Sequence, residues 1–149
     1  MPIGAICNRE VVIIRKDESV MAAAKLMRDY HVGGVVVVED REGRVIPVGV
    51  LTDRDIVVEL IARDVPLDSI SVEDVMSSDL LSVSENRGIS DALQCMRAKG
   101  VRRVIVVDDC GGLVGILSID DLLEILSDEL SDLVRLSKKE QNREREIRG

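Results

Sequence analysis

Aromatic side chains are almost missing from this chain, which limits what it can recognise. Phe and Trp do not occur, and Tyr30 is the single Tyr among 149 residues. Hydrophobic residues still make up 46% of the sequence, so the core must be aliphatic. Single-stranded nucleic acids are usually bound by stacking their bases on aromatic rings. We therefore expect no nucleic acid among the partners.

Positive charge is also scarce. The chain has 20 Lys and Arg against 28 Asp and Glu, a formal net charge of −8. An acidic surface repels nucleic acids and anionic membranes at long range. An anionic ligand would therefore depend on local positive groups.

Patterns typical of metal sites, secretion and membrane insertion are missing. Cys7, Cys95 and Cys110 are scattered without a CxxC pair, and His31 is the only histidine, so we expect no metal. Residues 1–4 do not read as a signal peptide, and apolar runs are far shorter than the roughly 20 residues of a membrane helix. We expect reduced thiols, no membrane and a cytoplasmic location.

Residue combinations that support catalysis are missing too. Acid–base and nucleophilic catalysis need a positioned base beside the reacting group. The chain has no GxSxG elbow and no P-loop. We therefore expect that the protein is not an enzyme and requires no cofactor.

What the chain does contain is an internal repeat. Residues 19–32 align with residues 88–101. The β-branched run 35–38 then falls on 104–107, and after a three-residue difference the segment from 49 meets the segment from 115. The matched residues of the first stretch are Ala23 with Ala92, Met27 with Met96, and Arg28 with Arg97.

Each repeat predicts the order strand, helix, strand, strand, helix. Ser19 is a good N-cap for the first helix, whose apolar residues recur at helical spacing. The β-branched runs suit strands buried on both faces. The predicted strands are 11–14, 35–38 and 45–51 in the first repeat and 80–83, 104–107 and 113–117 in the second. The predicted turns are 39–43 and 108–112, and the closing helices run from 52 to about 62 and from 118 to about 126.

The short linker 64–71 predicts that the two copies pack on each other as one pseudo-twofold α/β (α+β) body. We divide the chain into a first repeat (1–66), a second repeat (67–128) and a charged C-terminal helix or tail (129–149). Two interpretations of the tail are open. It is a solvated, fraying helix end, or it docks on a partner subunit.

A seven-residue motif occurs in both repeats: Gly, two apolar residues, Thr or Ser, two spacers, then Asp. It spans residues 49–55 and 115–121. With the repeat order, this pattern resembles the CBS-domain family in its tandem pair, or Bateman module, over about residues 3–126. Val75 and Met76 look like the family's opening, and residues Ala5 to Cys7 hold the same place in the first repeat, with Cys7 where Met is usual.

The resemblance implies that Thr52 and Ser118 contact a nucleotide phosphate and that Asp55 and Asp121 contact ribose hydroxyls. A helix start attracts anions, and a carboxylate one turn later suits sugar hydroxyls better than phosphate. Both Thr/Ser-x-x-Asp pairs are also capping boxes, which stabilise a helix without ligand. The two interpretations are compatible.

The resemblance also implies that basic residues before the third element meet phosphates. Arg102 and Arg103 stand there in the second repeat, whereas the first has Gly33 and Gly34. We therefore expect unequal sites, the one with the arginines being tighter. Alternatively, the arginines form surface salt bridges to Asp108, Asp109 or Asp120, and the glycines only permit close packing.

The resemblance further implies that the first strands line the base pocket, with Ile13 and Ser82 as the positions we select. It implies an adenine nucleotide (AMP, ADP or ATP) as the ligand, with S-adenosylmethionine or NADH as alternatives. Binding would shift the arrangement of the pair, which an unknown regulated protein would read. The alternative is a scaffold with vestigial sites.

A homodimer is also expected through apolar helix positions, unless these complete the monomer core: Leu60, Ile61, Leu122, Leu123, Ile125 and Leu126.

Overall fold

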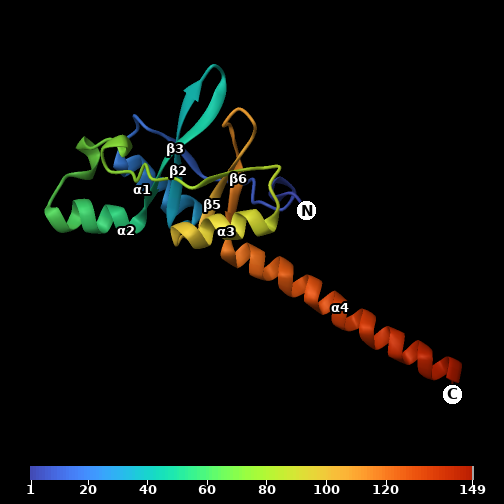
Figure 1. Ribbon diagram of the computed structural model, residues 1–149. Coiled ribbons are helices and arrows are strands. Elements are labelled where there is room, and N and C mark those ends of the chain that lie inside the picture. Colours follow the sequence, from blue (N-terminus) through green and yellow to red (C-terminus); the bar gives the residue numbers. More distant parts are fainter. Residues whose placement is uncertain (149) are drawn as a thin grey trace. The chain divides into compact units, whose positions relative to one another are not determined.

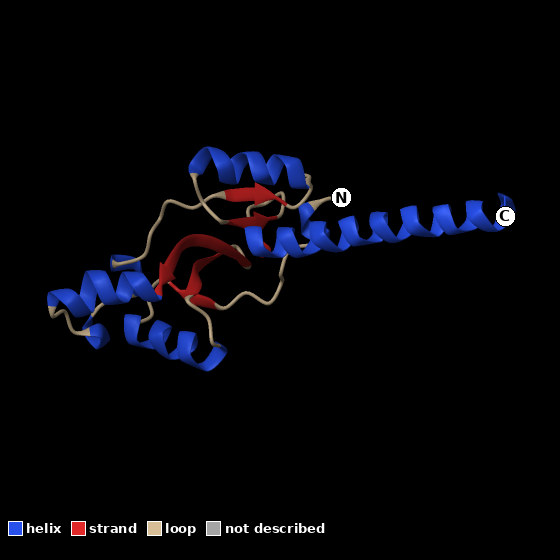
Figure 2. Ribbon diagram, turned by 90° about the horizontal axis from the view of Figure 1, so that it is seen from below, coloured by secondary structure: helices blue, strands red, loops and turns tan. Residues whose placement is uncertain are grey.

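The computed structural model describes residues 1–148 and separates into two units, residues 1–117 and the segment that begins at Ser118. Each repeat has the predicted order of elements (Figures 1 and 2). The first contains β1 (Ile13–Arg15), α1 (Val20–Tyr30), β2 (Gly34–Arg41), β3 (Arg44–Thr52) and α2 (Asp53–Asp55), which continues as helical turns Ile56–Leu60 and Ile61–Arg63. The second contains β4 (Ser82–Ser84), α3 (Ile89–Lys99), β5 (Arg103–Val107), β6 (Leu113–Ser118) and α4 (Ile119–Arg148).

Two three-stranded sheets form, in the orders β1-β2-β3 and β4-β5-β6. β1 is parallel to β2, and β2 pairs antiparallel with β3. The hairpin is longer than predicted, because pairing continues to Arg41 and Arg44. Only Glu42 and Gly43 form the turn, with φ of 50° and 78°. Such left-handed pairs close two-residue hairpins whose twist matches the strands.

A local signal sets the start of α1, as the sequence predicts. The Ser19 side chain accepts a hydrogen bond from the Ala22 N–H at 3.1 Å. The helix ends at Tyr30, and His31 takes the left-handed conformation with φ of 54°. In the second repeat Gly88 occupies the N-cap without a side-chain bond, and Gly100 takes the left-handed place.

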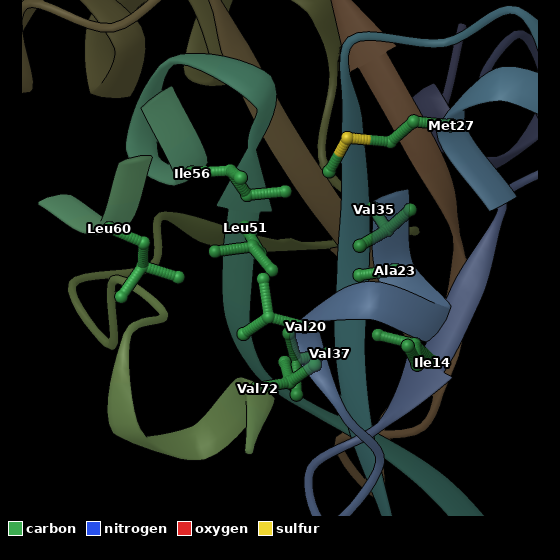
Figure 3. Packing of buried hydrophobic residues seen from close by; sticks show 10 residues of the cluster. All are labelled: Ile14, Val20, Ala23, Met27, Val35, Val37, Leu51, Ile56, Leu60 and Val72. Carbon is green, nitrogen blue, oxygen red and sulfur yellow. The ribbon is translucent and has the colours of Figure 1, made fainter. Parts of the chain in front are cut away.

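β2 is buried on both faces, as its β-branched run predicts. Val35 and Val37 point into a cluster under the first repeat's helices (Figure 3). Val36 and Val38 belong to a second cluster, to which Ile105 of the other repeat contributes. The shared second cluster is the reason why the two repeats pack together.

The repeats also exchange the segments that open them. We call residues 1–8 the first opening segment and residues 71–77 the second. Asn8 of the first exchanges two backbone hydrogen bonds of 2.9 Å with Ile116 of the second repeat. Ser77 of the second does the same with Val50 of the first repeat, also at 2.9 Å. Each repeat therefore contributes its opening segment to the packing of the other.

α4 is one continuous helix of 30 residues (Figure 1). The helix predicted to end near residue 126 and the charged segment after it are therefore one element. The last residue of the predicted tail, residue 149, lies outside the described residues. Among residues 1–148, no helix combines the length and hydropathy needed to cross a membrane.

Candidate functional site

The first candidate site is the corner where β3 ends at Thr52 and α2 begins. Thr52 Oγ1 accepts a hydrogen bond from the Asp55 N–H at 3.2 Å. The Thr52 N–H in turn donates to Asp55 Oδ2 at 3.0 Å. This is a complete capping box, and both residues are half-buried. The Thr52 hydroxyl proton and Asp55 Oδ1 are not used by the cap.

The second candidate corner repeats this geometry at the start of α4. Ser118 Oγ accepts from the Asp121 N–H at 3.1 Å, and the Ser118 N–H donates to Asp121 Oδ2 at 3.3 Å. Both residues are half-buried. The capping interpretation therefore holds at both corners. In each, one hydroxyl proton and one carboxylate oxygen could still bind a sugar-phosphate.

Gly33 and Gly34 lie beside the first corner. The Asp53 N–H donates to Gly33 O at 2.9 Å, and Gly34 pairs with Thr52 across the hairpin. A Cβ at Gly34 would lie 3.5 Å from Leu51 O, an ordinary contact. Close packing therefore does not explain Gly34. The first corner thus has Asp53 and Asp55 nearby, and neither Gly33 nor Gly34 adds positive charge.

Arg102 and Arg103 precede or begin β5, and both are exposed. Arg102 and Asp120, one of the acidic residues considered as partners, each take part in a polar or ionic interaction. The other two acidic candidates have bonds elsewhere. Asp108 Oδ1 accepts the N–H groups of its own turn, at 2.8 Å for Gly112. Asp109 Oδ1 accepts from the side-chain amide of Asn86 at 3.2 Å. The role of the arginines toward phosphate stays a prediction.

Ile13 and Ser82 occupy equivalent places in the two first strands. Ile13 is opposite Val36 in β2, and Ser82 is opposite Ile105 in β5. Ile13 is half-buried against the cluster shared by the two repeats, whereas Ser82 is exposed. Of the two proposed base-pocket residues, Ser82 is the more exposed to solvent.

The motif glycines have a role that the sequence reasoning missed. A Cβ at Gly49 would lie 2.4 Å from Met76 Sδ, and one at Gly115 would lie 2.5 Å from the Asn8 carbonyl oxygen. Each glycine therefore lets the opposite opening segment cross the strand that leads to the corner. One signal in the sequence could have indicated this role, because each glycine is the first residue of a motif that occurs twice.

A charged cluster ties the second opening segment to the first repeat. Lys16 Nζ lies 2.9 Å from Glu39 Oε2 and 4.0 Å from Glu73 Oε1, and Arg41 also pairs with Glu39. The hydrogen bond from Lys16 lowers the pKa of the Glu39 carboxyl, and the same bond raises the pKa of Lys16. This cluster was not apparent from sequence because it joins three separate segments.

Comparison with known proteins gives a consistent result. The profile of the CBS domain matches this chain twice, over residues 3–62 and 72–128. The protein MK0525 of Methanopyrus kandleri is 31% identical over 123 residues, which cover 83% of this chain but only 61% of that protein. The CBS domain-containing protein YhcV of Bacillus subtilis is 36% identical over 76% of each chain.

A solved structure shares the architecture. It is the CBS domain protein PAE2072 of Pyrobaculum aerophilum, determined in complex with AMP. The similarity has a TM-score of 0.70 and 26% sequence identity, over 85% of this chain and 99% of that one. The likeness thus extends over nearly all of that protein.

Proposed function

Because this chain belongs to the CBS-domain family as a tandem pair, we propose that it is a regulatory module that binds an adenine nucleotide of the AMP, ADP or ATP type. The observation that carries the proposal is the duplicated corner: a hydroxyl and a carboxylate one turn apart at a strand-to-helix junction. The AMP complex of the similar protein PAE2072 supports the choice of ligand class.

The chemistry of the corner suits a sugar-phosphate. The N–H groups at a helix start carry partial positive charge and attract phosphate. The Thr52 hydroxyl can donate to a phosphate oxygen while its oxygen keeps the bond from Asp55 N. Asp55 Oδ1 can accept from a ribose hydroxyl while Oδ2 keeps the bond from Thr52 N. Ligand binding therefore need not break the cap.

We propose unequal affinity at the two sites. Each corner has two aspartates in the first turn of its helix, Asp53 and Asp55 in the first and Asp120 and Asp121 in the second. Gly33 and Gly34 contribute no positive charge to the first corner. The second repeat contributes the exposed Arg102 and Arg103. Guanidinium groups bind phosphate through paired, charge-assisted hydrogen bonds. The site that uses the arginines is the tighter one.

Ligand binding would then favour one arrangement of the repeats, which a partner protein in the cytoplasm reads. A homodimer fits this proposal. Leu60 and Leu122 are 4% and 1% exposed, so they are buried within one copy of the chain. Ile61, Leu123 and Leu126 are 54%, 59% and 41% exposed, and these are available to a second copy.

The experiment is calorimetric titration of the wild type with AMP, ADP, ATP, S-adenosylmethionine and NADH. Asp121→Ala and Asp55→Ala are each expected to weaken nucleotide binding at the altered corner by about tenfold or more, because a charged hydrogen-bond acceptor is lost. Both changes also remove half of a cap, so unliganded stability is measured in parallel.

Ser19→Ala is the matched control. It removes a helix cap of similar strength from α1, at a residue outside both corners. It should lower thermal stability without changing nucleotide affinity. Wild-type protein that binds none of the five ligands at millimolar concentration would contradict the proposal and favour the scaffold function.

A further inference from the structure

α4 continues 20 residues beyond residue 128, where the match to the CBS domain ends. Its length of 30 residues corresponds to roughly 45 Å at 1.5 Å per residue. Large apolar side chains on it are exposed well into this extension. These are Leu123 (59%), Leu126 (41%), Leu130 (62%), Leu133 (63%), Val134 (48%) and Leu136 (62%).

The spacing of four of these leucines is that of a coiled coil. Leu123, Leu126, Leu130 and Leu133 are separated by three, four and three residues, which places them at successive a and d positions of a heptad. The four leucines form one seam along the helix, and Val134 and Leu136 lie at flanking e and g positions. Such a seam fits one other helix of the same kind.

The charges of α4 are divided along its length. Residues 119–134 contain six acidic and no basic side chains, whereas residues 135–148 contain six basic and three acidic ones. Two parallel copies would place acidic half beside acidic half and basic half beside basic half. Antiparallel copies bring Arg135 of each toward the acidic start of the other helix, and their helix dipoles also oppose.

Hydrophobic burial then sets the register. Antiparallel a positions face d positions, so one alignment joins Leu123 with Leu133 and Leu126 with Leu130 of the other copy, in four leucine layers. Other alignments would place Leu126 against Ser137 and Leu123 against Glu140. Burying a leucine contributes more than an exposed ion pair, so the alignment with four leucine layers is favoured.

We propose that α4 pairs antiparallel with α4 of a second copy of this chain through the seam Leu123–Leu126–Leu130–Leu133. In this alignment residues 119–137 of the two helices overlap, so the pairing would cover the leucines and place Arg135 of each copy beside the acidic start of the other helix. It uses no nucleotide contact, so it can fail while nucleotide binding holds, and the reverse. The homodimer proposed above shares Leu123 and Leu126 with this seam, whereas Leu130 and Leu133 belong to the seam alone.

The test measures particle mass of the full chain by light scattering and sedimentation across a concentration series. Leu130→Asp is expected to raise the dissociation midpoint at least tenfold. Ser131→Asp adds the same charge to an exposed neighbour outside the seam and should leave the midpoint unchanged. The double variant Leu126→Ala and Leu133→Ala keeps strong helix formers and should also weaken association. Circular dichroism checks that the helix persists.

Two serine-to-cysteine variants test direction. Ser127 lies near the twofold axis of the antiparallel register, so Ser127→Cys should form a disulfide between the two chains. Ser137 would meet its own copy only in parallel helices, so Ser137→Cys should not. Mass spectrometry of the linked peptides identifies which cysteines join. A monomeric wild type, an unaffected Leu130→Asp midpoint, a missing Ser127→Cys link or a Ser137→Cys link would each overturn the proposal.

Discussion

The two repeats agree in their backbone framework and differ in the side chains around it. Both place a strand-to-helix corner after a glycine that is crossed by the other repeat's opening segment. The first repeat has Gly33 and Gly34 where the second has Arg102 and Arg103. The first repeat has Ser19 as an N-cap where the second has Gly88. Packing imposes the same demands twice, whereas charges and caps at the surface can differ without disturbing it.

The largest expected effect concerns the crossing glycines. At Gly115 an added Cβ would meet a backbone carbonyl, Asn8 O, at 2.5 Å. At Gly49 the closest atom is Met76 Sδ, the end of a flexible side chain, with Ser77 O at 3.0 Å. We expect Gly115→Ala to lower the free energy of unfolding by about 3 kcal/mol and Gly49→Ala by about 1 kcal/mol.

Urea denaturation measures this difference. Gly34→Ala is the control, because its Cβ would make only ordinary contacts, at 3.5 Å or more. It should leave the free energy of unfolding almost unchanged. Equal losses in Gly115→Ala and Gly34→Ala would mean that the crossing of the opening segment does not require glycine.

The arginine pair allows the nucleotide affinities of the two repeats to be compared. Replacing both Arg102 and Arg103 with Ala is expected to weaken the tighter nucleotide site by about tenfold or more, since charge-assisted hydrogen bonds to phosphate are lost. Adenosine, which has no phosphate, should bind wild type and variant alike. Calorimetry with AMP and adenosine measures both, and an unchanged AMP affinity would refute the phosphate role.

The helix caps offer a smaller contrast between the repeats. Ser19→Ala should lower the free energy of unfolding by about 1 kcal/mol, because the Ala22 N–H loses its acceptor. Gly88→Ser should raise it by a few tenths, since a Cβ at Gly88 has open space. Thermal unfolding measures the two shifts. Shifts of the same sign would show that the two N-caps are not equivalent.

The smallest effect concerns the charged cluster of the first repeat. Lys16→Met should lower thermal stability slightly near neutral pH, because the bonds to Glu39 and Glu73 are lost from an exposed site. The pKa of Glu39 is lowered in the folded protein from its ordinary 4.5, so its contribution is present above that pH. It disappears as the pH falls through the lowered value.

The contribution of Lys16 to stability depends on pH in the opposite direction. Its pKa is raised in the folded protein from its ordinary 10.5, so its contribution is present below that pH and is lost as the pH rises through the raised value. The wild type and Lys16→Met should therefore differ between these limits and converge outside them. Lys25→Met removes an exposed charge from α1 and should show no such pH profile. A pH-independent difference would argue against the ion pairs.

Much of the fold could be predicted because its signals are local or periodic. The β-branched run from Val35 to Val38 predicts a strand buried on both faces, and Ser19 predicts the start of a helix. The hairpin was predicted too short because charged residues such as Arg41 are compatible with both strand and turn. The capping box at the first corner could be predicted because Thr52 and Asp55 are three residues apart and need no distant partner.

By itself, the sequence determined the duplication, the order of elements and the two capped corners, since each depends on residues near one another along the chain. Tertiary structure alone decided which repeat each opening segment joins. It also decided why Gly49 and Gly115 must lack a side chain and which leucines are covered. These features depend on contacts between residues far apart in sequence, and no local propensity records such contacts.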